Sequence, residues 1–459
     1  MEPSVTARLA ESIASLDAER FPPEVVSKVR DCLLDSLGCM LGASRIGEAR
    51  IAVDLVLGWG QQGDAAVPGL SGRYPAALAA YAAAQLANTL DYDDEFFGLG
   101  HPGATVIATA LAVGQEQRAS GKELIRAIVA GYEASIRIGR AMEASRQRQM
   151  TVRGHSWAVY AAVAATAALL RLDAPRIADA FGLAAQHALV PFVGKWYERP
   201  VPSVKNNYGW AAAGGVLAAY AAAAGAISNR EVLDGDSGFW AMAGSDRWDP
   251  EIVLSGLGSD FAVMHVEFKA YACVWYMHWA LDALEQILRS HPVDPSAVRS
   301  IAVRAAERLK VFGDYRPATL LHAQSSLPHA VASILLGKPL TTLNIGDPRV
   351  AELAERVRIE VDPGVDQSRI FSTMPSTVEI ELADGRRLSA RTEVAPGEPG
   401  RPLSRPQLRH KFFALAVPVV GISGADRLYR MIKELPEFPS AADLAGVFSN
   451  PSPYPDPLP

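Results

Sequence analysis

The residues best suited to chemistry begin with an acidic cluster near residue 91. The segment DYDDEFFGLGHPGATVIATALA places four carboxylates within five residues: Asp91, Asp93, Asp94 and Glu95. A glycine-flanked loop then leads to His101, and Pro102 favours the start of a helix directly after it. The cluster could be a solvated turn, a metal site or one wall of an active site, although its spacing does not match an EF-hand.

Three further segments place reactive side chains ahead of a predicted helix. They are His155 and Ser156 in VRGHSWAVYAAVAA, Lys205, Asn206, Asn207 and Tyr208 in SVKNNYGWAAAGG, and Lys269 in FKAYACVWYMHWALDAL. Helix N-termini carry unpaired N–H groups and a positive partial charge, so they attract carboxylates. These residues therefore predict a pocket for a negatively charged small molecule. The alternative is structural, because histidines near helix starts are often cap neighbours and lysines are usually solvated.

Apolar residues recur at helical spacing from Pro22 to about Leu288. The predicted helices cover residues 23–44, 74–90, 104–117, 121–143, 157–172 and 174–190. Their high alanine content predicts helices packed close together, several of them buried on more than one face. Strand-like alternation appears later, at residues 298–312, 356–362 and 376–394, and the last of these contains an Asp-Gly hairpin signal. A helix is predicted between them at 325–337.

This change of pattern divides the chain into three parts. Residues 1–268 form a helical part, residues 269–395 a smaller α+β unit, and residues 396–459 contain further helices at 405–421 and 424–438. The end of the chain, SNPSPYPDPLP, is too rich in proline for regular structure and is interpreted as a tail. The fold class is therefore mainly α.

Composition narrows the class of protein. The 459 residues are 49% hydrophobic and 20% charged, with a net charge of −6, and no strongly basic run is present, which argues against a nucleic-acid partner. The three cysteines show neither a disulfide framework nor metal-ligand spacing, which argues against a zinc site and against a cysteine-held iron–sulfur cluster. The N-terminus does not resemble a signal peptide. The uncharged stretch from Gly209 is mostly Ala and Gly, which favours a buried helix of a cytoplasmic protein over a membrane span.

Several motifs, taken in order, resemble the MmgE/PrpD family, which includes 2-methylcitrate dehydratase, cis-aconitate decarboxylase and iminodisuccinate epimerase. The similar segments are LLDSLGCMLGAS, LDYDDEFFGLGHPGATVIATALA, GHSWAVYAAVAATAALLRLDAPRIADAFGLA, VKNNYGWAAAGGVLAA, FKAYACVWYMHWALDAL, AQSSLPHAVASILL and PLSRPQLRHKFFALAVPVV. The resemblance spans nearly the whole chain. It implies one large helical domain built from both chain ends, an inserted α+β lid, a homodimer, and no metal or organic cofactor.

The resemblance also implies a site between the helical domain and the lid. Its catalytic positions would be Asp91, His101, His155, Lys205 and Lys269. Family reactions can pass through carbanion- or enolate-like charge next to a carbonyl, which preorganised cations must neutralise. Lys205 and Lys269 are the candidates for that role. His155 or His101 would be the base, with the other as acid or substrate donor, and Asp91 could orient a histidine or hold it charged. Asp93 and Asp94 would only shape or solubilise the loop.

The chain departs from the family at three positions. The family often has Thr where Glu95 stands, His where Tyr208 stands and Tyr where His329 stands. Together with Ser156, these residues are assigned to substrate binding. Glu95 would repel a substrate carboxylate unless it is protonated or paired, and it could instead meet an amine or act as a general base. This departure argues against methylcitrate or cis-aconitate and favours a modified substrate, such as a nitrogen-containing one.

The sequence therefore predicts a cofactor-independent lyase of the dehydratase type that acts on a small carboxylated substrate. Three alternatives remain open. The first is an isomerase, epimerase or cyclase that uses the same proton abstraction on another substrate. The others are a decarboxylase and a non-catalytic binding protein that kept the fold.

Overall fold

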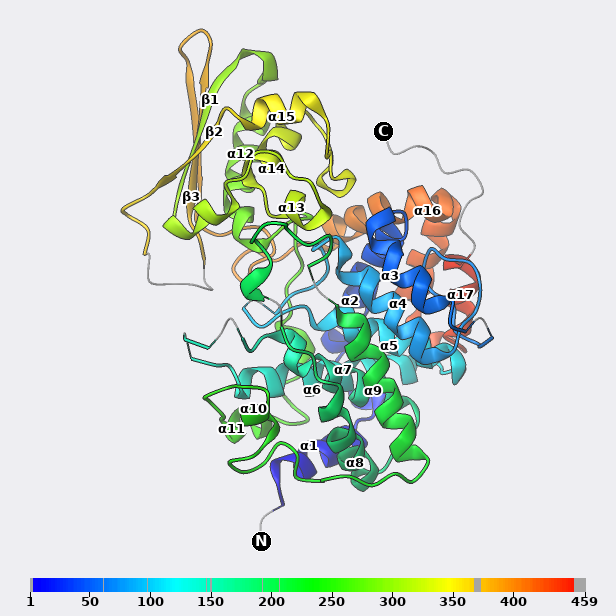
Figure 1. Ribbon diagram of the computed structural model, residues 1–459. Coiled ribbons are helices and arrows are strands. Elements are labelled where there is room, and N and C mark those ends of the chain that lie inside the picture. Colours follow the sequence, from blue (N-terminus) through cyan, green and yellow to red (C-terminus); the bar gives the residue numbers. More distant parts are fainter. Residues whose placement is uncertain are drawn as a thin grey trace.

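The computed structural model describes residues 3–60, 62–96, 98–145, 147–148, 151–191, 193–205, 207–366 and 373–449. Its described part is mainly α-helical, with one small sheet, as predicted (Figure 1). Asn206 and residues 450–459 of the predicted proline-rich tail lie outside the described residues.

Most helices belong to one body that surrounds a single hydrophobic core. From the N-terminal side these are α1 (Val5–Ala14), α2 (Pro23–Ala43), α3 (Gly47–Leu57), α4 (Ala76–Thr89), α5 (Pro102–Glu116), α6 (Gly121–Ala141), α7 (Gly154–Leu169), α8 (Ala174–Ala184), α9 (Tyr208–Ala223), α10 (Phe239–Met242) and α11 (Pro250–Leu254). The chain returns to this core with α16 (Arg405–Lys433) and α17 (Ala442–Phe448). The helices predicted from periodicity are present.

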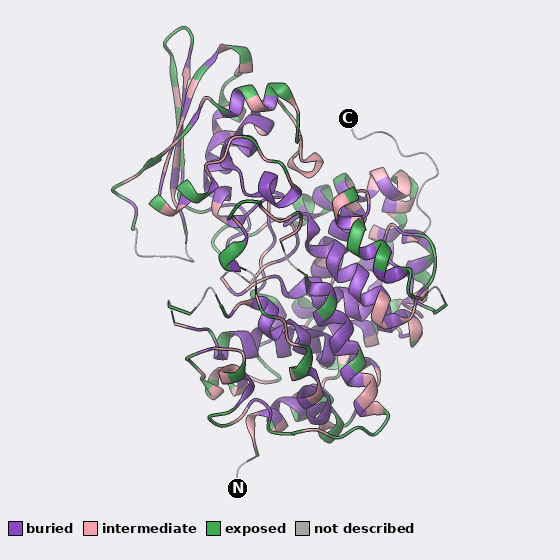
Figure 2. Cartoon of the chain, viewed as in Figure 1, coloured by how far each residue is buried: buried purple, intermediate pink, exposed green. Residues whose placement is uncertain are grey.

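Small residues allow the central helices to approach closely. Every residue of α7 is buried, and α7 packs against α5, α6, α8 and α9 (Figure 2). A Cβ added to Gly215 of α9 would lie 2.4 Å from the Cβ of Ala162 in α7. The stretch from Gly209 is thus largely a core helix, as the sequence indicated, and its packing depends on alanine and glycine.

The last long helix brings the two chain ends together. Phe412 and Leu415 of α16 contact α2 where Gly38 and Gly42 leave room for them. The two predicted helices at 405–421 and 424–438 are joined into α16 across a kink at Gly421, whose φ is 72°. Among the described residues, α16 alone is long and apolar enough to cross a membrane, with 39% of its apolar window buried. One such helix is weak evidence for a membrane protein, because core helices pass the same test.

The sheet belongs to a second unit with its own core, drawn from residues 271–382. Its strands are β1 (Val298–Ala305), β2 (Val357–Val361), β3 (Ser376–Leu382) and β4 (Arg387–Thr392), in the order β2-β1-β3-β4. β1 is parallel to β2 and antiparallel to β3, and β3 and β4 form the predicted hairpin. The unit also contains α12 (His278–Ser290), α13 (Leu320–Gln324), α14 (Leu327–Leu335) and α15 (Pro348–Ala354). The predicted boundaries at residues 268 and 395 stay predictions.

A buried lysine ties α16 to both α2 and the segment that leads into the sheet unit. Lys411 Nζ lies 2.7 Å from Asp35 Oδ1 and donates hydrogen bonds to the carbonyl oxygens of Tyr92 and Lys269. Burial raises the pKa of Asp35 to about 6, although Lys411 opposes that shift. The ammonium group therefore serves as a fixed cross-link between segments that are far apart in sequence.

We expect Lys411→Met to reduce the free energy of unfolding by roughly 3–5 kcal/mol, because it leaves Asp35 buried without its partner. Urea denaturation of the full chain measures this. The double variant Asp35→Asn/Lys411→Met should recover part of the loss, since it removes the stranded charge. A loss below about 1 kcal/mol would show that the ion pair is not a structural cross-link.

Candidate active site

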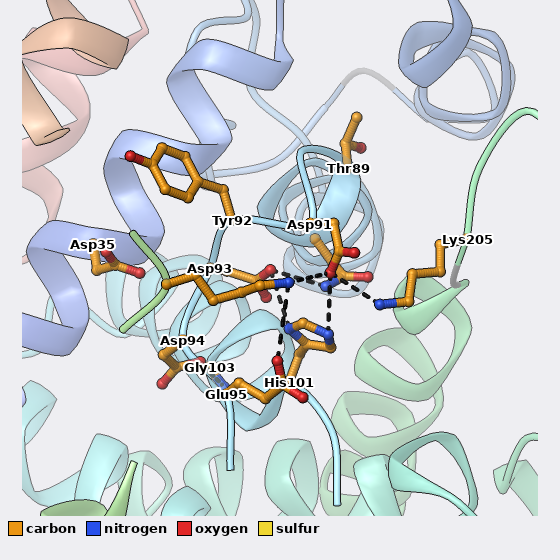
Figure 3. Close-up of polar contacts among 12 residues, drawn as sticks. Asp35, Thr89, Asp91, Tyr92, Asp93, Asp94, Glu95, His101, Gly103 and Lys205 are labelled. Atoms are coloured by element: carbon orange, nitrogen blue, oxygen red, sulfur yellow. Dashed lines mark hydrogen bonds and ion pairs between the residues drawn. The ribbon is translucent and has the colours of Figure 1, made fainter. Parts of the chain in front are cut away.

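Asp91 is the centre of a buried charge cluster. It follows α4 with a φ of 48°, and its residue is fully buried. Its Oδ1 atom accepts hydrogen bonds from Lys269 Nζ at 2.7 Å and from Lys205 Nζ at 2.9 Å, and lies 3.4 Å from His101 Nε2 (Figure 3). Burial opposes the charge, yet the two ammonium groups hold the pKa of the Asp91 carboxyl well below its usual range. Asp91 therefore gathers three of the predicted site residues around one oxygen atom.

His101 lies between two carboxylates. It is the residue directly before α5, and its Nδ1 atom is 3.3 Å from Asp93 Oδ1, which also accepts a hydrogen bond from Asn88. Burial alone would lower the pKa of His101, but the Asp93 carboxylate raises it above the ordinary histidine value. The imidazole is therefore favoured in its protonated form, with one carboxylate on each nitrogen (Figure 3).

The prediction that Asp93 and Asp94 solubilise the loop was wrong, because both residues are fully buried. Asp94 shapes the loop instead: it accepts hydrogen bonds from the Gly103 amide and the Tyr132 hydroxyl. Burial raises the pKa of Asp94 to about 7. A Cβ on Gly103, in the first turn of α5, would lie 2.2 Å from Asp94 Oδ1, so the contact between Asp94 and α5 requires glycine at this position.

His155 and Tyr208 form a second group. Both lie in the first turn of a helix, α7 and α9 respectively, and not ahead of it as predicted. Their rings stack with centroids 4.7 Å apart and planes 1° apart. Trp196 contacts the His155 ring edge-on at 5.8 Å, and Lys205 Nζ lies 5.4 Å from the Trp196 ring. An aromatic wall thus connects His155 to the lysines.

Lys269 does not precede a helix, which corrects the prediction. It lies in an irregular segment, and α12 begins only at His278. This segment is held by partners from elsewhere: Glu267 pairs with Glu95 through both backbone hydrogen bonds, and the Val274 amide binds the Gln324 carbonyl. Those tertiary contacts override the local helical pattern. The Lys269 side chain is fully buried, so Asp91 supplies its main countercharge.

A cavity of about 60 Å³ lies between the helical body and the sheet unit, and it is lined by His101, His155, Lys205 and Tyr208 but not by Asp91 or Lys269. Its acidic and basic lining side chains are Glu95, His101, Arg153, His155, Lys205 and Arg308. The helical body supplies most of the lining, while Tyr276 and Arg308 come from the other unit. About 10–15 Å³ of such space holds one water, so the cavity accommodates about four to six water-sized groups. It suits a small molecule.

Sequence reasoning missed Arg153, Arg308 and the role of Asp93. Arg153 stands two residues before His155 in a motif that had been singled out, which was a usable signal. No sequence signal pointed to Arg308, because a strand–turn pattern does not show which unit the side chain will face. Two assigned residues lie elsewhere. Ser156 lines a neighbouring cavity, and His329 binds the Leu343 carbonyl within the sheet unit, where burial lowers its pKa.

Glu95 and Glu267 form a carboxyl pair beside the lysines. Their backbones make an isolated antiparallel bridge, which sets the two side chains next to each other. Glu95 Oε2 lies 3.9 Å from Lys269 Nζ. Burial raises the pKa of Glu267 to about 8, and the charge of Glu95 acts in the same direction. At neutral pH the Glu267 carboxyl is therefore mainly protonated.

No group of three or more histidine, cysteine or acidic side chains is arranged to hold a metal ion in the described part of the chain. The acidic cluster near residue 91 is built instead around lysine and histidine partners.

Comparison with known proteins agrees with this architecture. The MmgE/PrpD N-terminal domain matches residues 7–251 and the MmgE/PrpD C-terminal domain matches residues 271–437. The chain therefore belongs to the MmgE/PrpD family. It is 25% identical to cis-aconitate decarboxylase from Homo sapiens, over 98% of this chain and 95% of that protein. It is also 25% identical to cis-aconitate decarboxylase from Aspergillus terreus, over 94% of this chain and 93% of that protein.

The raised pKa of Glu267 predicts a pH-dependent stability. Between pH 4.5 and about 8 the folded state keeps a proton that the unfolded state has released, so this group lowers the free energy of unfolding as the pH rises. In Glu267→Gln that contribution is absent. The stability of the variant relative to the unmodified chain should therefore increase from pH 5 to pH 8, as measured by urea denaturation.

The exposed Glu11→Gln provides the matched control, and its relative stability should not follow this trend. A stability difference for Glu267→Gln that stays constant across the same pH range would contradict the assignment.

Proposed function

We propose that this protein is a cofactor-independent lyase that acts on a small carboxylated substrate. One observation carries the proposal: two lysines and His101 converge on the buried Asp91, and His101 and Lys205 line a cavity that His155 also lines. Such a site can neutralise negative charge that develops on a substrate carbon, and low polarity around it strengthens that effect. The decarboxylases among its relatives support a lyase.

The geometry supports different roles for the two histidines. His101 is already favoured as a cation by Asp93, so it is suited to donate a proton. His155 stacks on the Tyr208 ring and lines the cavity. We assign His155 as the base that removes a proton next to the substrate carboxylate. His101 then protonates the leaving hydroxyl group in a dehydration.

We assign Lys205 and Lys269 the role of stabilising the enolate-like negative charge that forms after proton removal. Their ammonium groups are fixed by Asp91, so little reorganisation is needed as charge develops. Asp91 thus acts as a positioning residue. Arg153 and Arg308 hold the carboxylate of the substrate, because a guanidinium group matches a carboxylate with two parallel hydrogen bonds.

Decarboxylation is the second candidate. The relatives named above are cis-aconitate decarboxylases, and loss of CO₂ also leaves negative charge on carbon. The same lysines would stabilise that charge, and His101 would then deliver the proton. In this reaction His155 would not act as a base, which separates the two candidates experimentally.

We further propose that the sheet unit acts as a lid. It contributes Tyr276 and Arg308 to the cavity, so its movement would open the site to substrate. By analogy with the family, we also propose that the protein is a homodimer located in the cytoplasm.

We expect His155→Ala to slow solvent deuterium incorporation into the substrate by about 10²–10⁴-fold, because the base is removed. The measurement follows a panel of small di- and tricarboxylic and hydroxy acids in D₂O by NMR. The exposed His291→Ala serves as control and should retain full exchange.

Exchange that is unchanged in His155→Ala would refute the role of His155. Release of CO₂ that survives in His155→Ala but is lost in His101→Ala would favour the decarboxylase. The absence of any exchange or turnover in the unmodified protein would indicate a binding protein.

A further inference from the structure

The short helix α13 of the sheet unit contacts all three segments that meet at the buried charge cluster around Asp91. Figure 1 shows α13 on the side of the sheet unit that faces the helical body. Its residues Leu320, Leu321 and Gln324 are buried. The motif AQSSLPHAVASILL begins in this helix, and His329, the residue of the motif assigned to substrate binding, makes its contact within the sheet unit instead.

Gln324 reaches the end of α4, two residues before Asp91. Its Nε2 atom donates a buried hydrogen bond of 2.8 Å to the carbonyl oxygen of Thr89. Carbonyl groups in the last turn of a helix lack partners within that helix, so this contact satisfies one of them. Asp91 has a φ of 48°, a left-handed backbone that a non-glycine residue keeps only where its surroundings hold it. Gln324 thus supports the turn from which the Asp91 side chain projects.

The first turn of α13 holds the segment that carries Lys205. The Leu321 amide donates a hydrogen bond of 3.2 Å to the carbonyl oxygen of Ser203, two residues before Lys205. The Leu321 side chain also packs in a small apolar cluster with Trp196. The Trp196 ring lies 5.4 Å from Lys205 Nζ. One residue of the sheet unit therefore supports both the backbone beside Lys205 and the ring next to its ammonium group.

The same helix holds the segment that carries Lys269. The Gln324 carbonyl accepts a hydrogen bond of 2.9 Å from the Val274 amide, five residues beyond Lys269. Three segments that are distant in sequence are thus bound to one helix of five residues, and each segment supplies one charged group to the cluster. Ion pairs depend only weakly on direction, whereas hydrogen bonds require both distance and angle. The contacts of α13 therefore restrict the geometry of the cluster more closely than its charges alone.

We propose that α13 positions the charge cluster and that Gln324 is the positioning residue on which this depends most. While the sheet unit lies against the helical body, α13 sets the spacing of Asp91, Lys205 and Lys269. When the sheet unit moves away, these segments lose a shared support. The inference rests on the proposed function for the catalytic role of the cluster. It adds that the sheet unit assembles the site as well as covering it.

The variant Gln324→Met tests the proposal, because methionine keeps a similar side-chain length and removes the donor. Amide hydrogen exchange of the full chain, followed by mass spectrometry, should become roughly 5- to 100-fold faster at Leu321 and Val274, as expected for the loss of one buried hydrogen bond. Exchange in β1 should stay unchanged, which distinguishes release of α13 from global unfolding. The matched control is Gln286→Met, since the Gln286 amide group donates to side chains of α12 and β4 inside the sheet unit.

The same variant should lower kcat for solvent deuterium incorporation by about 10- to 100-fold, because a small misplacement of catalytic groups is costly. KM should change by less than about threefold, since Gln324 does not line the cavity. A second variant, Glu48→Ala, removes the carboxylate that accepts the Leu320 amide at the other end of α13 and should have the same local effect on amide exchange.

Unchanged amide exchange at Leu321 and Val274 in both folded variants would overturn the inference, as would faster exchange with an intact kcat in Gln324→Met. If the unmodified protein incorporates deuterium into no carboxylic acid, the proposed function fails, and amide exchange alone then decides whether α13 holds the three segments. If deuterium is incorporated equally well by Gln324→Met and the unmodified protein, the proposed function stands and the inference fails.

Discussion

One carboxylate oxygen, Asp91 Oδ1, holds the site together. It accepts from two lysines that are 64 residues apart in sequence and also contacts His101. Burying charges is costly unless they are paired, so Lys269 can enter the interior only because Asp91 is already there. The same contact joins the loop after α4, the loop before α9 and the segment leading to the sheet unit. Stability and chemistry therefore depend on the same ion cluster.

This arrangement suits the cavity to the charge on carbon that the proposed reaction requires. Asp91 fixes the two lysines before a substrate arrives, and Trp196 and Tyr208 line the cavity beside Lys205. Asp93 keeps His101 charged from the side opposite Asp91. The carboxylates thus neutralise the cations and also hold each one in a defined position.

Local patterns predicted local structure well. Helical periodicity predicted α2 and α4 to α8, and the Asp384–Gly385 signal predicted the β3–β4 hairpin, since both depend on neighbours in sequence. Motif order predicted the family. Sequence could not show that Lys269 lies in an irregular segment or that Arg308 and His155 line the same cavity, because long-range contacts decide both. The burial of Asp93 could not be predicted for the same reason, because its partners Asn88 and His101 come close to it only after the loop folds.

The central claim is that a buried carboxylate, that of Asp93, raises the pKa of His101 and so favours its charged form. The most direct test is an NMR titration of the His101 ring in the intact protein and in Asp93→Asn. The account predicts that His101 titrates above the ordinary value of 6.5 in the intact protein and that its pKa falls in the variant. A His101 ring that is neutral throughout the titration, or whose pKa is indifferent to the loss of the Asp93 charge, would contradict the account.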